Sequence, residues 1–120
     1  SNNSYARAFP VVPGPQYYGT VYSDSVSSAD VVDVLSIAMS PGRYRIQLDF
    51  SGADLDMYLR DNSSNNFKTI IKSDLTGNTG PETIVYDETR TGPVTRYIVI
   101  SLYSGTPGPK SYQIRIEKLS

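Results

Sequence analysis

The residues best suited to chemistry in this chain are Asp54 and Asp56, in the run Ala-Asp-Leu-Asp-Met-Tyr-Leu at positions 53–59. Side chains two positions apart in a strand point to the same face, so an extended run makes these carboxylates neighbours. Such a pair can bind a hard cation, or it can act as an acid and a base, as paired carboxylates do in glycosidases. In the alternative interpretation, Asp54 stabilises the turn after Gly52, and Asp56 bonds to the backbone or to Arg60.

Other catalytic residue types are missing, since the sequence holds no histidine and no cysteine. This excludes a Ser-His-Asp or Cys-His arrangement within the chain, and nothing marks a serine–lysine pair. A carboxylate pair alone lacks the further polar groups that catalysis requires. The residue types therefore favour a binding or accessory protein over an enzyme. The enzymatic alternative is a small hydrolase that uses Asp54 and Asp56.

Length and composition indicate one folded domain that spans residues 1–120. Of the 120 residues, 38% are hydrophobic and 19% are charged, which is typical of a globular domain with its own core. The net charge is −1 without a basic run, so nucleic acid is not an expected partner. No apolar stretch approaches the ~20 residues of a membrane helix, so no membrane span is expected.

Alternating apolar and polar residues, separated by turn residues, predict an all-β fold. In residues 43–50, the side chains of one face are all apolar: Tyr44, Ile46, Leu48 and Phe50. This period of two is the pattern of a half-buried strand. The nearly continuous apolar stretch 97–102 predicts a central strand covered on both faces.

The whole pattern contains about eight strands, which predicts a sandwich or a barrel. The proline-containing residues 1–18 are expected to form an extended lead-in. An immunoglobulin-like sandwich is the second choice, although its Cys-Trp-Cys marker is absent. The expected strands are residues 19–24, 31–39, 43–50, 54–61, 67–73, 82–87, 96–103 and 112–118.

Several runs, in order along the chain, resemble the bacterial pre-peptidase C-terminal domain family. The run at 53–59 is close to Ala-Asp-Leu-Asp-Leu-Tyr-Leu, the most recognisable stretch of that family. Further similar runs are Asn-Asn-Ser-Tyr-Ala-Arg-Ala at 2–8, Asp-Val-Val-Asp-Val-Leu-Ser-Ile at 30–37, Glu-Thr-Ile at 82–84, Tyr-Ser-Gly at 103–105 and Ser-Tyr-Gln-Ile at 111–114. Together these runs extend the resemblance over nearly the whole chain.

This resemblance implies a jelly-roll-like antiparallel β-sandwich that serves as a non-catalytic accessory domain of a secreted peptidase or other exported hydrolase. The implied location is extracellular, and the parent hydrolase domain is the implied partner in cis. The implied roles are stability, secretion, or attachment to a protein or polysaccharide substrate. A stand-alone or tandem cell-surface adhesion module is the alternative.

The resemblance also implies a calcium site. In calcium-binding relatives, an Asp-x-x-Asp pair joins acidic and amide groups from the segment before the first strand. The matching residues here are Asn2, Asp30 and Asp33. In the alternative interpretation, Asp30 caps a turn and Asp33 lies on a solvated face.

Tyrosine is frequent, with 10 residues, and it combines a rigid ring with a hydroxyl group that suits ligand contacts. We expect Tyr86, Tyr97 and Tyr103 to line one sheet face and to contact a ligand. In the collagen-binding branch of the family, the strand equivalent to the one with Tyr103 carries Tyr-x-Tyr-Ser-Gly. Residues 101–105 of this chain read Ser-Leu-Tyr-Ser-Gly instead. The alternative is that these tyrosines are packing residues.

Overall fold

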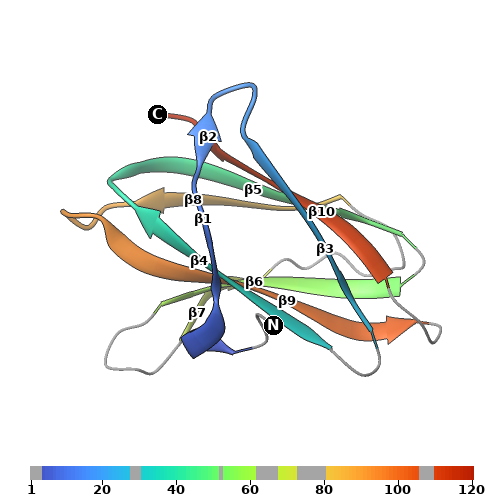
Figure 1. The fold of residues 1–120 in the computed structure, drawn as a ribbon. Helices are drawn as coiled ribbons and strands as arrows, with labels where there is room; N and C mark the ends of the chain where they lie inside the picture. The colour runs from blue at the N-terminus through green and yellow to red at the C-terminus, as the bar shows by residue number, and fades with distance from the viewer. Residues whose placement is uncertain (1–3, 28–30, 52, 62–67, 73–80, 106–109) are drawn as a thin grey trace.

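The computed structural model describes residues 4–27, 31–51, 53–61, 68–72, 81–105 and 110–120. These residues form one short 3-10 turn and ten strands (Figure 1). The turn is η1 (Tyr5–Arg7), and the strands are β1 (Phe9–Val11), β2 (Gly14–Pro15), β3 (Thr20–Val26), β4 (Val32–Met39), β5 (Gly42–Phe50), β6 (Ala53–Asp61), β7 (Thr69–Lys72), β8 (Glu82–Glu88), β9 (Val94–Gly105) and β10 (Lys110–Lys118).

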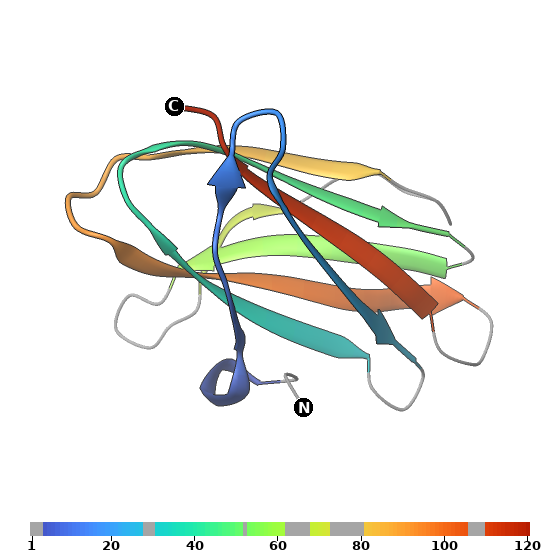
Figure 2. The ribbon, with the colours of Figure 1, turned by 45° about the horizontal axis from the view of Figure 1, so that its top comes forward.

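The strands form two five-stranded sheets packed as a sandwich, as Figure 1 and Figure 2 show. Sheet A has the order β1-β4-β9-β6-β7, and sheet B has the order β2-β10-β5-β8 with β3 also paired to β10. Without β1 and β2, the two orders are β4-β9-β6-β7 and β3-β10-β5-β8, which is the strand arrangement of a jelly roll. The predicted fold class is therefore confirmed.

The core lies between the sheets and follows the predicted alternation. From sheet B it receives Ile46 and Leu48 of β5, and from sheet A it receives Leu55, Met57 and Leu59 of β6, all of them fully buried. Each such side chain stabilises the fold by about 1.5–3 kcal/mol relative to its exposed state. β9 lies between β4 and β6, which confirms the central strand predicted from residues 97–102.

The lead-in contributes more structure than the sequence predicts. Instead of a plain extended segment it contains η1, β1 and β2, so the described residues form ten strands where the sequence predicts about eight. β1 pairs with β4 and β2 pairs with β10, and both pairs are parallel, in a sandwich whose other described strand pairs are antiparallel as predicted. Strands of two or three residues are too short to show alternation. Pro10 and Pro15 are accommodated because both strands lie at sheet edges, where a missing N–H removes no central ladder bond.

A buried ion network joins the two sheets at the C-terminal ends of β6 and β8. The guanidinium of Arg96, on β9, donates to both carboxylate oxygens of Glu88, at 2.7 and 3.1 Å. It also donates to Asp61, the last residue of β6. Arg96 and Glu88 are each 3% exposed, so this bidentate pair is shielded from solvent.

The ion network shifts the titration of its members. Burial raises the pKa of Glu88, but hydrogen bonds from the Arg96 side chain and the Arg90 amide, with the charge of Arg96, outweigh burial and hold the pKa below its ordinary value. The hydrogen bond to Glu88 is the main cause that raises the pKa of Arg96. Both groups therefore stay charged in the folded protein at neutral pH.

The described part of the chain contains no helix with the length and hydropathy that a membrane span requires.

Candidate metal centre

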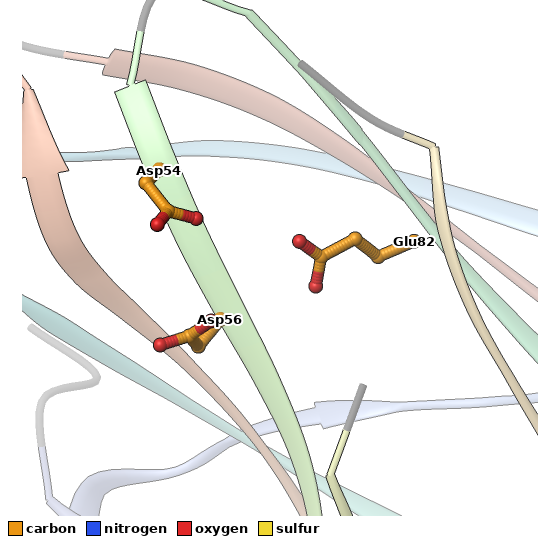
Figure 3. A group of neighbouring side chains, drawn as sticks. All are labelled: Asp54, Asp56 and Glu82. Carbon is orange, nitrogen blue, oxygen red and sulfur yellow. The ribbon is translucent and has the colours of Figure 1, made fainter. Parts of the chain in front are cut away.

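Three carboxylates from the two sheets meet at the N-terminal ends of β6 and β8. Asp54 and Asp56 belong to β6 in sheet A, and Glu82 is the first residue of β8 in sheet B. One oxygen from each carboxylate lies within 4.8 Å of the other two. Figure 3 shows Glu82 extending from its own strand toward the strand that carries both aspartates. We call these three residues the acidic triad.

The local sequence explains how β6 supplies two members of the acidic triad. Asp54 and Asp56 lie two positions apart on β6, so their side chains lie on the same side of the strand. The register between β6 and β9 also shifts between Asp54 and Leu55. Irregularities of this kind re-aim side chains at the end of a ladder.

The acidic triad is largely removed from water. Glu82 is 1% exposed and Asp56 is 9% exposed. The Oδ1 atom of Asp54 is enclosed and has no hydrogen-bond partner among the described residues. Close carboxylates in such surroundings repel one another, and carboxylate oxygens are the ligands that hard cations prefer. The acidic triad can therefore bind an ion.

The sequence identifies only part of this centre. Asp54 and Asp56 are predicted as a possible cation pair, but Glu82 is not predicted to join them because it is distant in sequence and belongs to the other sheet. A signal for it does exist. Glu82 shares its strand face with the buried Ile84, and a glutamate at an inward-facing position is a residue that needs a charged or polar partner.

Asp33 lies in the interior of the protein. It is 1% exposed, so its placement on a solvated face is wrong. Its Oδ2 accepts a 2.5 Å hydrogen bond from the Tyr112 hydroxyl, which reaches it from sheet B. Asn2 and Asp30 lie outside the described residues, so a calcium site at Asn2, Asp30 and Asp33 stays a prediction.

The three tyrosines predicted to share one sheet face are separated. Tyr86 lies on β8 in sheet B and packs against the core. Tyr97 lies on β9 in sheet A, where its ring meets that of Tyr5 edge-on at 5.0 Å. The prediction of one shared face is therefore wrong. Tyr103 also belongs to β9, but its side chain lies outside the described part of the chain.

A cavity of about 380 Å³ lies beside η1 on sheet A. Tyr5, Tyr58 and Val99 are among its lining residues. Arg60 fixes one wall, because its guanidinium donates to the Tyr5 hydroxyl at 2.7 Å and lies 4.8 Å from the centre of the Tyr58 ring. This combination of rings, an aliphatic floor and a guanidinium can receive a small amphipathic group.

No protein-family model matches the sequence, and no curated protein matches it either. Among solved structures, the chain is similar to the pre-peptidase C-terminal domain of a collagenase from Bacillus anthracis. The TM-score is 0.69 at 16% identity, over 92% of this chain and 94% of that chain. The chain has the fold of a pre-peptidase C-terminal domain. The resemblance seen in the ordered sequence runs is thereby confirmed as a likeness of fold.

Two other solved structures are similar in fold to this chain. The Yersinia pseudotuberculosis-derived mitogen has a TM-score of 0.63 at 15% identity, over 90% of this chain and 87% of that chain. The Aeromonas hydrophila protein PliG, a periplasmic inhibitor of g-type lysozyme, has a TM-score of 0.53 at 11% identity, over 92% and 97%. One sandwich thus supports different functions, and the function of this chain has to be argued from its own residues.

Proposed function

We propose that residues 1–120 form a single non-catalytic accessory module of a secreted peptidase or another exported hydrolase. The observation that carries this proposal is the likeness of fold to the collagenase pre-peptidase C-terminal domain over 92% of the chain. The lack of histidine and cysteine supports a non-catalytic role. The module stabilises its parent enzyme, aids secretion, or holds the enzyme near a protein or polysaccharide substrate.

The gene context and an adhesion assay test this function. A hydrolase domain encoded beside this chain supports the proposal, whereas tandem β-modules without an enzyme support the alternative of a surface adhesin. Retention of the purified chain on collagen, gelatin, chitin or cellulose supports the attachment role. Retention on none of them leaves stabilisation or secretion as the role of the module.

Calcium is the ion that suits the acidic triad best, because Ca²⁺ prefers several carboxylate oxygens and tolerates irregular geometry. The enclosed Oδ1 of Asp54 supports this assignment, since a bound cation compensates a desolvated carboxylate oxygen. The resemblance to calcium-binding relatives supports Asn2, Asp30 and Asp33 as a second place for the ion. Melting curves with calcium and with chelator test both places.

Ligand contacts by tyrosine belong to the same proposal. Tyr97 and Tyr103 share β9, the central strand of sheet A, and Tyr86 offers a separate contact on sheet B. Alanine at each position tests the assignment on whichever matrix retains the wild type. Reduced retention for Tyr97→Ala or Tyr103→Ala supports a ligand face on sheet A, and reduced retention for Tyr86→Ala alone moves the contact to sheet B.

A further inference from the structure

Exposed apolar side chains are concentrated in the segment that runs from β1 to β3. Seven large hydrophobic residues are exposed among the described residues, and five of them lie between positions 9 and 21. The two most exposed are adjacent in sequence, Tyr17 at 84% and Tyr18 at 75%. Single exposed hydrophobic residues need no explanation, but a concentration of them marks a candidate contact surface.

The two tyrosines lie on the tight turn that joins β2 to β3, residues 15–19, which we call the tyrosine turn. The amides of Tyr18 and Gly19 both donate to the Pro15 carbonyl, at 3.2 and 2.8 Å. Tyr17 has a φ of 75°, and it is the one non-glycine residue of the described chain with a positive φ. This conformation costs an aromatic residue about 1–2 kcal/mol, and such strain is typical of functional positions.

Side chains from β10 hold the tyrosine turn in place. The Tyr17 amide donates to Oε2 of Glu117 at 2.9 Å, and the Arg115 guanidinium donates to the Tyr18 carbonyl. The turn also closes against Gly14, where a Cβ atom would lie 2.1 Å from the Gly19 carbonyl carbon. The neighbouring charges therefore bind the turn's backbone, and the two rings stay exposed on a rigid support.

The position of the tyrosine turn leaves it accessible. Figure 1 and Figure 2 both place it beside the C-terminus, at the end of the sandwich away from the N-terminus. The cavity beside Tyr5 lies on sheet A, whereas the tyrosine turn joins two strands of sheet B. It is therefore a separate surface.

We propose that the tyrosine turn is a contact site for an uncharged polysaccharide. Tyr17 and Tyr18 lie against the C–H faces of sugar rings, because the negative face of an aromatic ring attracts polarised C–H groups. Their hydroxyls and the exposed Gln16 amide bond to sugar hydroxyls. This inference rests on the attachment role proposed above, and it assigns the ligand class and the residues.

The size and charge of the tyrosine turn favour a sugar polymer over a folded protein. Two tyrosine rings bury roughly 300–400 Å² when covered, whereas a stable protein complex buries about 800 Å² on each partner. Residues 15–19 read Pro-Gln-Tyr-Tyr-Gly and carry no charged side chain, which suits a neutral ligand. One such contact is weak. A polymer offers repeating sites, however, so several modules can bind to it at once.

The test measures retention of the whole chain on microcrystalline cellulose, chitin beads and starch granules, with collagen fibrils and phospholipid vesicles in parallel. Tyr17→Gly removes one ring and suits the positive φ, so its melting temperature should equal or exceed that of the wild type. Tyr18→Ala removes the second ring. Val85→Ala, at an exposed valine of sheet B, is the control.

We expect each ring removal to lower the apparent affinity for at least one polysaccharide about two- to tenfold, and the double variant to lower it further. The Val85→Ala control should bind like the wild type. Unchanged retention of the double variant on a polysaccharide that retains the wild type overturns this site but keeps the attachment role. Tyrosine-dependent retention on collagen or vesicles alone overturns the sugar assignment. Retention of the wild type on no matrix overturns the attachment role itself.

Discussion

Buried carboxylates lie at both ends of strands β6 and β8, and the groups that surround them differ between the two ends. At the C-terminal ends, Asp61 and Glu88 share the guanidinium of Arg96. At the N-terminal ends, one oxygen from each of Asp54, Asp56 and Glu82 lies within 4.8 Å of the other two. The same pair of strands thus carries one site with a built-in cation and one that collects negative charge.

This contrast separates a structural site from an exchangeable one. An arginine is fixed in the chain and charged at every physiological pH, so the Arg96 network joins the sheets under all such conditions. A cation bound at the acidic triad would come from the solution, so its occupancy depends on the ion concentration. We therefore expect the first end to set the baseline stability, and the second end to respond to calcium.

The largest effect should follow from removal of the fixed cation. Arg96→Met leaves Glu88 and Asp61 in place without the guanidinium, and the loss of one partner from a buried pair costs about 3–5 kcal/mol. Urea unfolding measures this loss. The control is Arg43→Met, because Arg43 and Asp87 form an exposed pair at 3.2 Å, and such pairs contribute about 0–1 kcal/mol. Equal losses in the two variants would contradict the structural role of the network.

Calcium should have the next largest effect. An ion that binds only the folded state stabilises it by about 2.7 kcal/mol at a hundred times its Kd. The melting temperature should therefore rise with calcium and fall back when a chelator is added. Glu82→Gln should remove this response, whereas Asp87→Asn, at an exposed carboxylate, should retain it.

Two results would decide against the acidic triad. A calcium response that survives in Glu82→Gln and is lost in Asp33→Asn would place the ion at Asn2, Asp30 and Asp33. Identical melting of the wild type in calcium and in chelator would remove the ion from both places.

The hydrogen bond between Tyr112 and Asp33 should have a smaller effect on stability. Tyr112→Phe removes the 2.5 Å hydrogen bond to Asp33 and leaves the ring in the core. Hydrogen bonds to charged groups contribute about 1.5–3 kcal/mol, so chemical denaturation should show a loss in that range. A loss below about 0.5 kcal/mol would mean that other groups already satisfy Asp33.

The smallest expected effect is the loss of the stabilisation by Glu88 at low pH. The pKa of Glu88 is lowered in the folded state, so at mildly acidic pH the unfolded chain binds more protons and stability rises with pH. The contribution of Glu88 is complete above the ordinary glutamate pKa of about 4.3, and it is lost as the pH falls toward the folded-state pKa. The stability difference between wild type and Glu88→Gln should therefore shrink below that pH in urea titrations. A difference that stays constant down to pH 2 would contradict the lowered pKa.

Local alternation explains which parts of the fold were predictable from sequence. In β5, β6 and β10, apolar and polar residues alternate with a strict period of two. The sequence therefore predicts correctly which side chains of these strands face the core. Alternation does not say to which sheet a strand belongs, so Tyr86 and Tyr97 were placed on one face although they lie in different sheets. The β1 and β2 strands were missed because they are too short for a period and contain proline.

The candidate sites were predictable only where they are local. Asp54 and Asp56 are neighbours on one strand, and this follows from the sequence alone. Glu82 joins them only because β6 and β8 pack across the sandwich, which is a contact between distant parts of the chain. The exposure of Tyr17 and Tyr18 depends on Glu117 and Arg115, which hold the turn from the last strand. No local pattern records such a contact.

The position of β10 affects the order in which this protein can assemble. β10 pairs with β2, β3 and β5, so without β10 only β5 and β8 of sheet B are paired to each other. Contacts between such distant segments form slowly, because long loops must close first. Strands β2 and β3 therefore gain their partner in sheet B only when the last strand is in place. We therefore expect a version that ends before β10 to remain unfolded.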